Sequence, residues 1–393
     1  MGRRATIAGL ATVPLAHGAR AQSDAVKIGV LTDESGPYAD SGGPGSVLAA
    51  RMAAADFGPT VLGKPIEIVH GDTLNKPDVA GALARKWYDS DGVDVITDLP
   101  VTPVALAVQQ AAKEKQRSVM ITAAAITEFT SKLCSPYSTH WADDTHALTV
   151  GTAREVVRGG GKSWFFITVD FSFGRALEAE AKSIIEANGG RMVGSAYFPI
   201  GNTDFSSQLI AAQSSGAEII GLAAVGNDQV NLIKQAREFG VQSKGKQRLA
   251  GFLVYLTDIH ALGLNVSQGL TFSSGFYWDQ TDASRAFSKR FFAERHAMPT
   301  KNQAAIYVAS LHFLKAMAQA GSRDAVAVGR AMRALPVDYL GHKASVRGDG
   351  RVLYALTLYR VKSPQESKAP WDYLTAVATV PAAEAFLAQS CGM

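Results

Sequence analysis

Short apolar runs alternate with longer amphipathic stretches along most of the chain, and this alternation predicts strands and helices in turn. The first run, from Val26 to Leu31, is rich in β-branched residues, as in strands buried on both faces of a parallel sheet. A loop rich in Gly, Ser and Pro follows, and an apolar helix is expected to begin near Ser41 or Gly45. Because ligands bind at the carboxyl ends of parallel strands, we expect the loop from Ser35 to Gly43 to form one lip of a binding site.

This unit of strand, loop and helix repeats along two separate stretches of the chain. In the first stretch we expect strands at 66–69, 93–97 and 119–121 and helices at 77–88 and 104–113. Residues 134–144 then break the rhythm with Pro, Ser, Thr and aromatic residues. In the second stretch we expect helices at 145–158, 174–188, 205–214 and 227–239, and strands at 164–169, 192–197, 218–222, 249–253 and 270–276. The pattern predicts an α/β protein of two doubly wound, Rossmann-like lobes with a cleft between them.

Apolar residues at helical spacing return between 282 and 335, and these helices are expected to pack on the first lobe. A further strand is expected at 351–361. The chain then crosses between the lobes three times, near 141, 276 and 338, and a three-segment hinge favours closure around a ligand. These boundaries assign 22–141 and 276–338 to an N-terminal lobe, 142–275 and 339–362 to a C-terminal lobe, and 363–393 to a tail tied back to the N-terminal lobe.

The first 21 residues have the composition of a removable export segment. Arg3 and Arg4 precede an apolar stretch, and Ala19-Arg20-Ala21 provides the small-residue pattern of a cleavage site. An ordinary N-terminal helix is the alternative, which Pro14 and Gly18 disfavour. We therefore predict a signal peptide over 1–21 and a soluble exported protein.

Charge gives no indication of a nucleic-acid partner. The chain has 39 Lys and Arg against 35 Asp and Glu, and removal of residues 1–21 takes away three arginines and no acids, which leaves 36 against 35. A nearly neutral protein lacks the basic surface that nucleic acids require. After residue 21, no stretch of the sequence has the roughly 18 consecutive apolar residues that a membrane-spanning helix needs.

The two cysteines, Cys134 and Cys391, are predicted to form a disulfide, because an exported protein meets an oxidising compartment. Such a bond ties the C-terminal end of the chain to a loop far earlier in the sequence. Two free buried thiols are the alternative.

No catalytic, metal-binding or cofactor-binding motif emerges from the sequence. Residues 159–163 read GGGKS, but the first glycine of a phosphate-binding loop is missing and the segment precedes a strand, so a plain turn is expected. The nearest pair of histidines, His140 and His146, lacks metal-ligand spacing, and a surface role beside the hinge is expected for it. Asp143-Asp144 fits the start of a helix. We therefore expect neither an enzyme nor a cofactor.

Several segments together resemble the periplasmic solute-binding proteins of ABC importers, of the leucine/isoleucine/valine-binding type. The resemblance rests on VKIGVLTDESGPYADSGG, GKPIEIVHGDTLNKPDVA, DVITDLPVTPVALAV, VDFSFGRALE, the loop at 202–205 and NLIKQAREFG. It covers essentially the whole chain after the export segment. It implies a type I periplasmic binding fold, a location in the periplasm, and a small solute held in the cleft and presented to an inner-membrane permease.

The family's ligand contacts fall on positions that have changed in this chain. The loop after the third strand, which usually offers serines to an α-amino acid, retains one hydroxyl, that of Thr102, and the loop after the fourth strand reads Ala124-Ala125-Ile126. The segment that carries the family's ammonium-binding acid reads Leu253-Val254-Tyr255. Because a buried ammonium without an acceptor costs several kcal/mol, these changes disfavour an amino acid.

The remaining candidates favour an aromatic carboxylate, with rings as walls and hydroxyls or helix-start amides for the anion. Further segments, Thr139-His140-Trp141, DFSFG and Phe276-Tyr277-Trp278-Asp279, resemble the subgroup associated with aromatic acids from lignin breakdown. The candidate contacts are Tyr38, Ser41, Pro100, Val101, Thr102, Thr122, Ala124, Ala125, Trp141, Phe171, Ser172, Phe173, Asn227, Tyr255 and Tyr277.

Some of these residues have a structural alternative. Trp141 and Tyr277 fit a hinge as well as a ligand site, Thr102 and Asn227 fit helix caps, and either Phe171 or Phe173 is expected to belong to the core.

The sequence therefore predicts a monomeric carrier of a benzoate-like or phenylpropanoid-type acid. A branched-chain or other hydrophobic amino-acid carrier and a periplasmic sensory module remain as alternatives, and an enzyme would need a nucleophile and base that are not visible.

Overall fold

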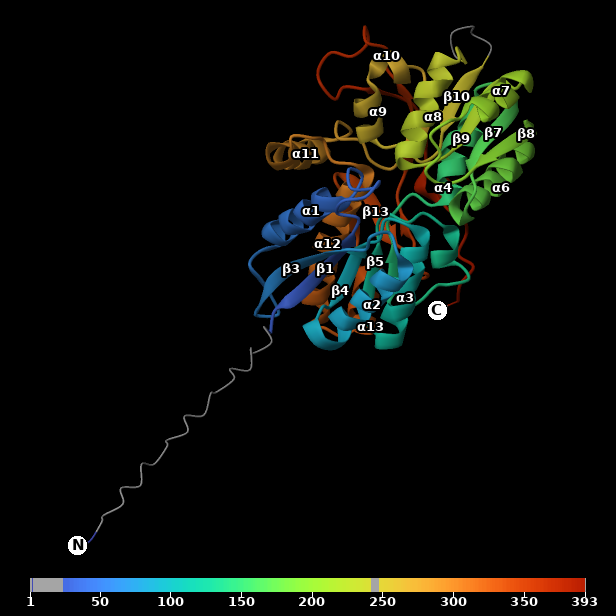
Figure 1. Cartoon of the computed structure of the whole chain (residues 1–393). Helices are drawn as coiled ribbons and strands as arrows, with labels where there is room; N and C mark the ends of the chain where they lie inside the picture. Colours follow the sequence, from blue (N-terminus) through green and yellow to red (C-terminus); the bar gives the residue numbers. More distant parts are fainter. Residues whose placement is uncertain (1, 3–23, 242–246, 393) are drawn as a thin grey trace.

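The computed structural model describes residue 2 and residues 24–241 and 247–392. Apart from residue 2, the predicted export segment lies outside the described residues. Figure 1 shows two α/β lobes, one above the other, with the N-terminal half of the chain beginning in the lower lobe. We call the lobe built on the six-stranded sheet the first lobe and the lobe built on the seven-stranded sheet the second lobe. The fold class predicted from the sequence is confirmed.

The first lobe has a sheet in the order β2-β3-β1-β4-β5-β6, parallel except for β2. Its strands are β1 (Val26–Thr32), β2 (Thr60–Val61), β3 (Lys64–Asp72), β4 (Val95–Asp98), β5 (Ser118–Ile121) and β6 (Ser138–His140). Its helices are α1 (Gly43–Phe57), α2 (Pro77–Lys86), α3 (Thr102–Lys115), α11 (Asp282–Arg295), α12 (Lys301–Ala320) and α13 (Ala325–Ala334), with the π-helical turn η1 (Trp87–Asp91) and the 3-10 turn η2 (Thr127–Thr130).

Both faces of this first sheet are buried, as the apolar run of β1 predicts. Val26, Ile28 and Val30 join the hydrophobic cluster under α1 and α12, whereas Leu31 joins the cluster under α2 and α3. Helices 282–320 therefore return to the first lobe, where α12 packs along α1.

The second lobe has a sheet in the order β16-β15-β11-β10-β9-β7-β8. Its strands are β7 (Ser163–Val169), β8 (Arg191–Phe198), β9 (Ile219–Ala223), β10 (Arg248–Gly251), β11 (Thr271–Ser274), β15 (Leu356–Val361) and β16 (Leu374–Val380). Its helices are α4 (Thr145–Thr149), α5 (Glu155–Arg158), α6 (Ser172–Ala187), α7 (Ser206–Ser214), α8 (Gly226–Glu238), α9 (Leu256–Leu262) and α10 (Leu264–Ser267), with the π-helical turn η3 (Val150–Arg154) between α4 and α5. The helix expected at 145–158 is thus present, with a π-helical turn at its centre.

The two sheets repeat one topology. Strands β3-β1-β4-β5-β6 and β8-β7-β9-β10-β11 are both parallel and both follow the doubly wound order 2-1-3-4-5. In such sheets ligands bind beyond the carboxyl ends of the strands, where the strand order reverses. The two lobes therefore offer two sets of strand-end loops to one cleft.

The C-terminal part of the chain differs from the sequence prediction. Residues 337–353 form a small sheet of β12 (Val337–Tyr339), β13 (His342–Val346) and β14 (Val352–Leu353), whose apolar side chains join the core of the first lobe. The third crossing accordingly lies between β14 and β15, after residue 353. The segment predicted as a tail contributes β16, which pairs antiparallel with β15 in the second lobe, and the short helix α14 (Ala382–Ala385).

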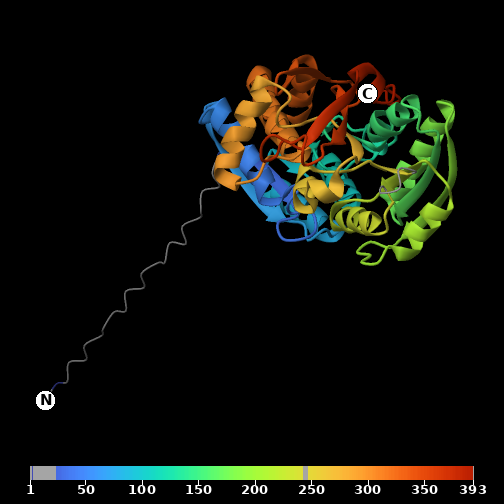
Figure 2. The same cartoon turned by 90° about the horizontal axis from the view of Figure 1, so that it is seen from above.

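The end of the chain nevertheless returns to the first lobe. Cys134 and Cys391 form the disulfide that the sequence predicts, with their Cα atoms 6.5 Å apart. Figure 1 shows the red C-terminal segment passing from the upper lobe to the C-terminus beside the lower lobe, and Figure 2 shows that this end of the chain lies at the edge of the molecule. Among the described residues, no helix combines the length and the apolar character that crossing a membrane requires.

Candidate ligand-binding site

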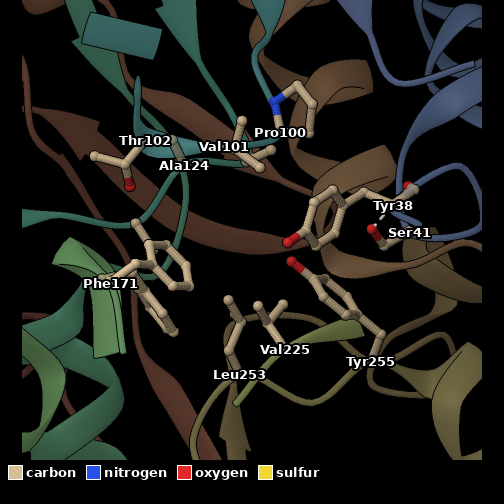
Figure 3. A pocket seen from close by; sticks show the side chains of 13 residues that line it. Tyr38, Ser41, Pro100, Val101, Thr102, Ala124, Phe171, Val225, Leu253 and Tyr255 are labelled. Carbon is tan, nitrogen blue, oxygen red and sulfur yellow. Dashed lines mark hydrogen bonds between the residues drawn. The ribbon is translucent and has the colours of Figure 1, made fainter. Parts of the chain in front are cut away.

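A pocket of about 400 Å³ lies between the lobes, at the carboxyl ends of their strands (Figure 3). It is lined by Tyr38, Ser41, Pro100, Val101, Thr102, Ala123, Ala124, Ala125, Phe171, Phe173, Val225, Leu253 and Tyr255. These residues follow β1, β4 and β5 in the first lobe and β7, β9 and β10 in the second. The pocket therefore occupies the place that the repeated topology assigns to a ligand.

Four helices begin at residues that line this pocket. The residues immediately before their first turns are Val101 for α3, Phe171 for α6, Val225 for α8 and Tyr255 for α9. Val, Phe and Val carry no side-chain acceptor, and no side chain caps α3, α6 or α8. Because the first backbone N–H groups of a helix lack intrahelical partners and carry the positive end of its dipole, these three helix starts present hydrogen-bond donors suited to an anion.

The second lobe supplies the apolar wall. The rings of Phe171 and Phe173 lie with their centroids 5.9 Å apart and their planes tilted by 34°. Phe173 is buried in the lobe's core, whereas Phe171 is partly exposed toward the pocket. Val225 and Leu253 continue the same surface. This wall matches the flat, apolar face of a ring.

Two tyrosine hydroxyls reach the pocket from opposite lobes. Figure 3 shows the hydroxyl groups of Tyr38 and Tyr255 directed into the space between them. Burial, with nearby Asp228 and Asp33, raises the pKa of Tyr38 to about 12, and burial also raises the pKa of Tyr255, so both are neutral donors at neutral pH. Asn302 Nδ2 donates to the Tyr255 hydroxyl at 3.1 Å.

The loop that carries Tyr38 is folded around a buried carboxylate. Asp33 accepts hydrogen bonds from the backbone N–H of Gly36 at 2.7 Å and of Tyr38 at 2.9 Å, and from Asn75 Nδ2 at 2.8 Å. The Tyr38 ring then meets the other lobe, because a Cβ added to Gly226 would lie 3.3 Å from its Cε1 atom. The lobes are therefore in contact across the mouth of the pocket.

The start of α12 fixes the other end of this loop. Thr300 Oγ1 donates to the Ser41 carbonyl at 2.7 Å, and Gln303 Nε2 donates to the Gly42 carbonyl at 3.0 Å. Gln303 also fills the space beside Gly45 so completely that a side chain there would collide with it. Ser41 is thus held at the pocket by the start of α12, about 260 residues later in the sequence.

Besides Asp33 and Asp228, which lie near Tyr38, two further buried carboxyl groups lie close behind the lining residues, and none of the four lines the pocket. Asp258 accepts the backbone N–H of Tyr255 at 2.9 Å and caps α9, and burial raises its pKa to about 7. Asp98 ends β4 with φ +79°, and burial raises its pKa to about 6. The lining itself contains no acidic side chain.

The first hinge segment is tied directly to the pocket loop after β5. His140 Nε2 donates to the Ala124 carbonyl at 2.8 Å, and Arg351 Nη1 donates to His140 Nδ1 at 2.9 Å. Burial and the neighbouring guanidinium hold the pKa of His140 well below its usual range, so the ring is neutral. His140 is therefore an interior residue, which corrects the surface position expected from the sequence. Asp144 caps α4 by accepting the Ala147 N–H at 2.8 Å, as expected.

Most of the residues predicted as ligand contacts meet in this pocket, and five do not line it. Ser172 and Asn227 are exposed on the first turns of α6 and α8. Thr122 is buried and donates to the Asp98 carbonyl at 3.4 Å. Trp141 lies in the core of the first lobe, where its indole N–H donates to Thr139 Oγ1 at 2.8 Å. Tyr277 lines a neighbouring cavity.

Sequence reasoning did not select Ala123, Val225 and Leu253 as contacts, although all three line the pocket. Leu253 lies in a segment that the resemblance pointed to, and Val225 and Leu253 follow the ends of β9 and β10, so the position at a strand end was the available signal. Within the described ranges, no group of three or more His, Cys, Asp or Glu side chains is placed to hold a metal ion.

Residues 25–368 match the periplasmic binding protein family. A periplasmic binding protein from Burkholderia mallei is 44% identical, with a TM-score of 0.88 over 93% of this chain and 96% of that one. A branched-chain amino acid ABC transporter periplasmic ligand-binding protein from Burkholderia xenovorans is 38% identical, with a TM-score of 0.85 over 92% of this chain and 96% of that one. A solute-binding protein from Rhodopseudomonas palustris, solved in complex with 4-hydroxybenzoate, shares the fold at 22% identity, with a TM-score of 0.82 over 91% of this chain and 97% of that one. The chain therefore belongs to the periplasmic binding protein family, and it is a solute-binding component of an ABC importer rather than an enzyme.

Proposed function

We propose that this protein binds a small aromatic carboxylate by closure of its two lobes and delivers it to an inner-membrane permease. The observation that carries the proposal is the composition of the pocket wall, which combines aromatic and aliphatic surface, hydroxyl groups and uncapped helix starts with no acidic side chain.

The ring of such a ligand suits the wall formed by Phe171, Phe173, Val225 and Leu253. Offset or edge contacts between aromatic rings add about 0.5–1.5 kcal/mol to the gain from burying their area.

The carboxylate of the ligand suits the start of α3. Thr102 is the first residue of that helix and lines the pocket, and the preceding Val101 leaves the N–H groups of Thr102 and Val104 without a side-chain acceptor, whereas Pro103 between them has no N–H. The neutral hydroxyls of Tyr38 and Tyr255 are further donors. Hydrogen bonds to an ionised acceptor are shorter and stronger than those between neutral groups.

An α-amino acid suits this pocket less well. Its ammonium group would enter a closed space lined by no carboxylate, and desolvation of an unpaired charge costs several kcal/mol. The name of the Burkholderia xenovorans neighbour keeps a branched-chain amino acid as the competing hypothesis, and the Rhodopseudomonas palustris neighbour is a precedent for an aromatic acid on this fold.

Thermal denaturation of the purified protein with single ligands distinguishes these hypotheses. Benzoate and 4-hydroxybenzoate are expected to raise the melting temperature by a few degrees, because a ligand at 100 times its Kd stabilises the folded state by about 2.7 kcal/mol. Leucine and valine, at the same concentrations, are expected to leave it unchanged. A shift with leucine or valine and none with aromatic acids would overturn the ligand class and leave the family assignment in place.

A further inference from the structure

A cavity on the first lobe, which we call the α13 cavity, lies apart from the ligand pocket, and among the described residues the two share no lining side chain. Val326, Arg330 and Arg333 of α13 form one wall, and Pro136 and Gly348 form the other from the turns before β6 and β14. Figure 1 shows α13 at the end of the first lobe that faces away from the second lobe. The cavity measures about 290 Å³, whereas one water molecule needs only about 10–15 Å³ of such space, so a small organic molecule fits.

A close approach of α13 to the loop that carries Pro136 fixes the shape of this cavity. Val326, Arg330 and Arg333 recur at helical spacing and therefore share one face of α13. Gly329 lies beside them, and a Cβ added to it would come within 3.0 Å of the Pro136 carbonyl oxygen. A larger residue at this position would push the helix away from the loop. The glycine therefore keeps the two walls of the cavity together.

Arg333 places a fixed positive charge in the cavity. Its Nε atom donates to the Gly348 carbonyl and its Nη1 atom to the Gly329 carbonyl, each at 2.9 Å. Burial lowers its pKa, but an arginine stays charged at neutral pH. The acid whose charge acts on it, Asp349, is already paired with Arg347 at 2.7 Å, and no carboxylate of the described residues pairs with Arg333 itself. A half-buried guanidinium without an acidic partner favours the binding of an anion.

Arg330 adds a second charge on the same face of the helix. It is exposed, and within the described ranges it forms no hydrogen bond or ion pair, so all five of its N–H donors are available. Like charges three residues apart on a helix repel each other. An anion between Arg330 and Arg333 would relieve this repulsion.

We propose that the α13 cavity is a second binding site, which takes a small organic carboxylate. The carboxylate group lies between the guanidinium groups of Arg330 and Arg333, which bind such groups through paired, charge-assisted hydrogen bonds. The hydrocarbon part lies against Val326 and Pro136, and this apolar surface favours an organic acid over an inorganic anion. The inference goes beyond the proposed function and does not depend on what the cleft binds.

Equilibrium dialysis with radiolabelled benzoate tests this site by counting the molecules bound per chain. Wild-type protein is expected to bind one more molecule at saturation than Arg330→Gln does. Because Arg330 is exposed and does not line the ligand pocket, the variant is expected to fold and to keep the affinity of the cleft. At the α13 cavity, benzoate is expected to bind about fivefold more tightly than acetate, the ratio that about 40 Å² of buried apolar area gives.

Arg51 of α1 provides a matched control, because it is an exposed arginine of the same lobe that forms no hydrogen bond or ion pair with the described residues. Arg51→Gln removes the same charge and is expected to bind as many molecules as the wild type. Equal numbers of bound molecules in wild type and Arg330→Gln, or the same loss in Arg51→Gln, would overturn the site. Equal affinity for acetate and benzoate would overturn its assignment to an organic ligand.

A crystal structure with 4-bromobenzoate locates the additional molecule. The anomalous signal of bromine is expected in the α13 cavity of the wild type and not in that of Arg330→Gln, and a signal in the cleft alone would refute the proposal. If the cleft binds no aromatic acid, the wild type is expected to bind one benzoate and Arg330→Gln none. The proposed function would then fail while the second site stands, so the two failures are distinguishable.

Discussion

The wall of the ligand pocket makes a quantitative prediction at Phe171. This residue precedes the first turn of α6 with φ −149° and ψ 179°, an extended conformation that any residue adopts, and its side chain makes no capping hydrogen bond. Replacing it with Ala removes a ring that is partly exposed toward the pocket and leaves the buried Phe173 behind it. Binding of an aromatic acid is expected to weaken by about 1–3 kcal/mol, the value of burying and stacking one aromatic face. In dissociation constants this is roughly a 5- to 150-fold increase.

Stability separates this effect from general damage to the lobe. The free energy of unfolding of Phe171→Ala is expected to fall by less than about 2 kcal/mol, whereas Phe173→Ala, which removes a fully packed core ring, is expected to lose about 3–5 kcal/mol. Isothermal titration with 4-hydroxybenzoate and urea denaturation measure the two quantities.

Phe239 provides a matched control for this experiment, because it is a partly buried phenylalanine at the opposite end of α8 from the pocket. Phe239→Ala is expected to leave the dissociation constant unchanged. An unchanged dissociation constant in Phe171→Ala would refute the role of that ring as a pocket wall.

Two further predictions concern the connection between the lobes. Reduction of the Cys134–Cys391 disulfide, or replacement of both residues by Ala, is expected to lower the free energy of unfolding by about 2–4 kcal/mol in urea denaturation and to leave ligand affinity nearly unchanged, because neither cysteine lines the pocket. Glu180 accepts from Thr127 of the first lobe at 3.2 Å and from Thr145 of the second at 2.9 Å, and burial raises its pKa from 4.5 to about 7. Between these two pKa values the folded state holds a proton that the unfolded state has released, so the free energy of unfolding should decline as the pH rises from about 4.5 to 7. Glu180→Gln should remove up to about 3 kcal/mol of that decline. Equal pH dependence of stability in both proteins would show that Glu180 does not titrate in this range.

Much of the fold was predictable from the sequence because parallel strands leave a strong signal. A strand buried on both faces must be apolar at nearly every position, and the runs at β1, β7 and β9 meet that requirement. The helices between them begin and end within a few residues of the predicted bounds, where Gly, Pro and Asn interrupt the apolar pattern. The strand-end loops then follow from the topology, and with them most of the pocket.

The C-terminal segment was not predictable in the same way. Leu374–Val380 is an edge strand with several exposed positions, so its apolar content is low and its flanking prolines suggest a loop. Its partner, β15, is antiparallel and follows a break at residues 354–355, which the sequence pattern merges into one longer strand. The neighbouring hairpin of β13 and β14 carries apolar side chains that fit either lobe, and only the three-dimensional path of the chain assigns it to the first.

Side-chain direction explains the difference between predicted and observed contacts. Trp141 follows β6 at the edge of the cleft. From the sequence alone, an aromatic side chain at this position fits the pocket as well as the core. In the structure its ring packs edge-on against His312 of α12, with ring centroids 5.7 Å apart, and Arg351 occupies the adjoining hinge interior. The choice depends on α12 and on residue 351, which are far away along the chain. A local pattern carries no information about that choice.

The buried acids near the pocket show how a neutral wall is compatible with nearby carboxyl groups. Asp258 is directed at the backbone N–H of Tyr255, and Asp98 lies near the start of α1, where a Cβ on Gly42 would come within 3.1 Å of its Oδ2 atom. Asp258 thus serves a helix start, whereas both carboxylate oxygens of Asp98 are buried without a hydrogen-bond partner, and burial raises the pKa of Asp98 to about 6 and that of Asp258 to about 7. A ligand carboxylate bound as proposed would therefore face tyrosine hydroxyls and helix N–H groups, and the two acids behind them carry less charge than free carboxylates at the same pH. This arrangement lowers the repulsion that the proposed carboxylate would meet, and the lining offers an ammonium group no acidic side chain.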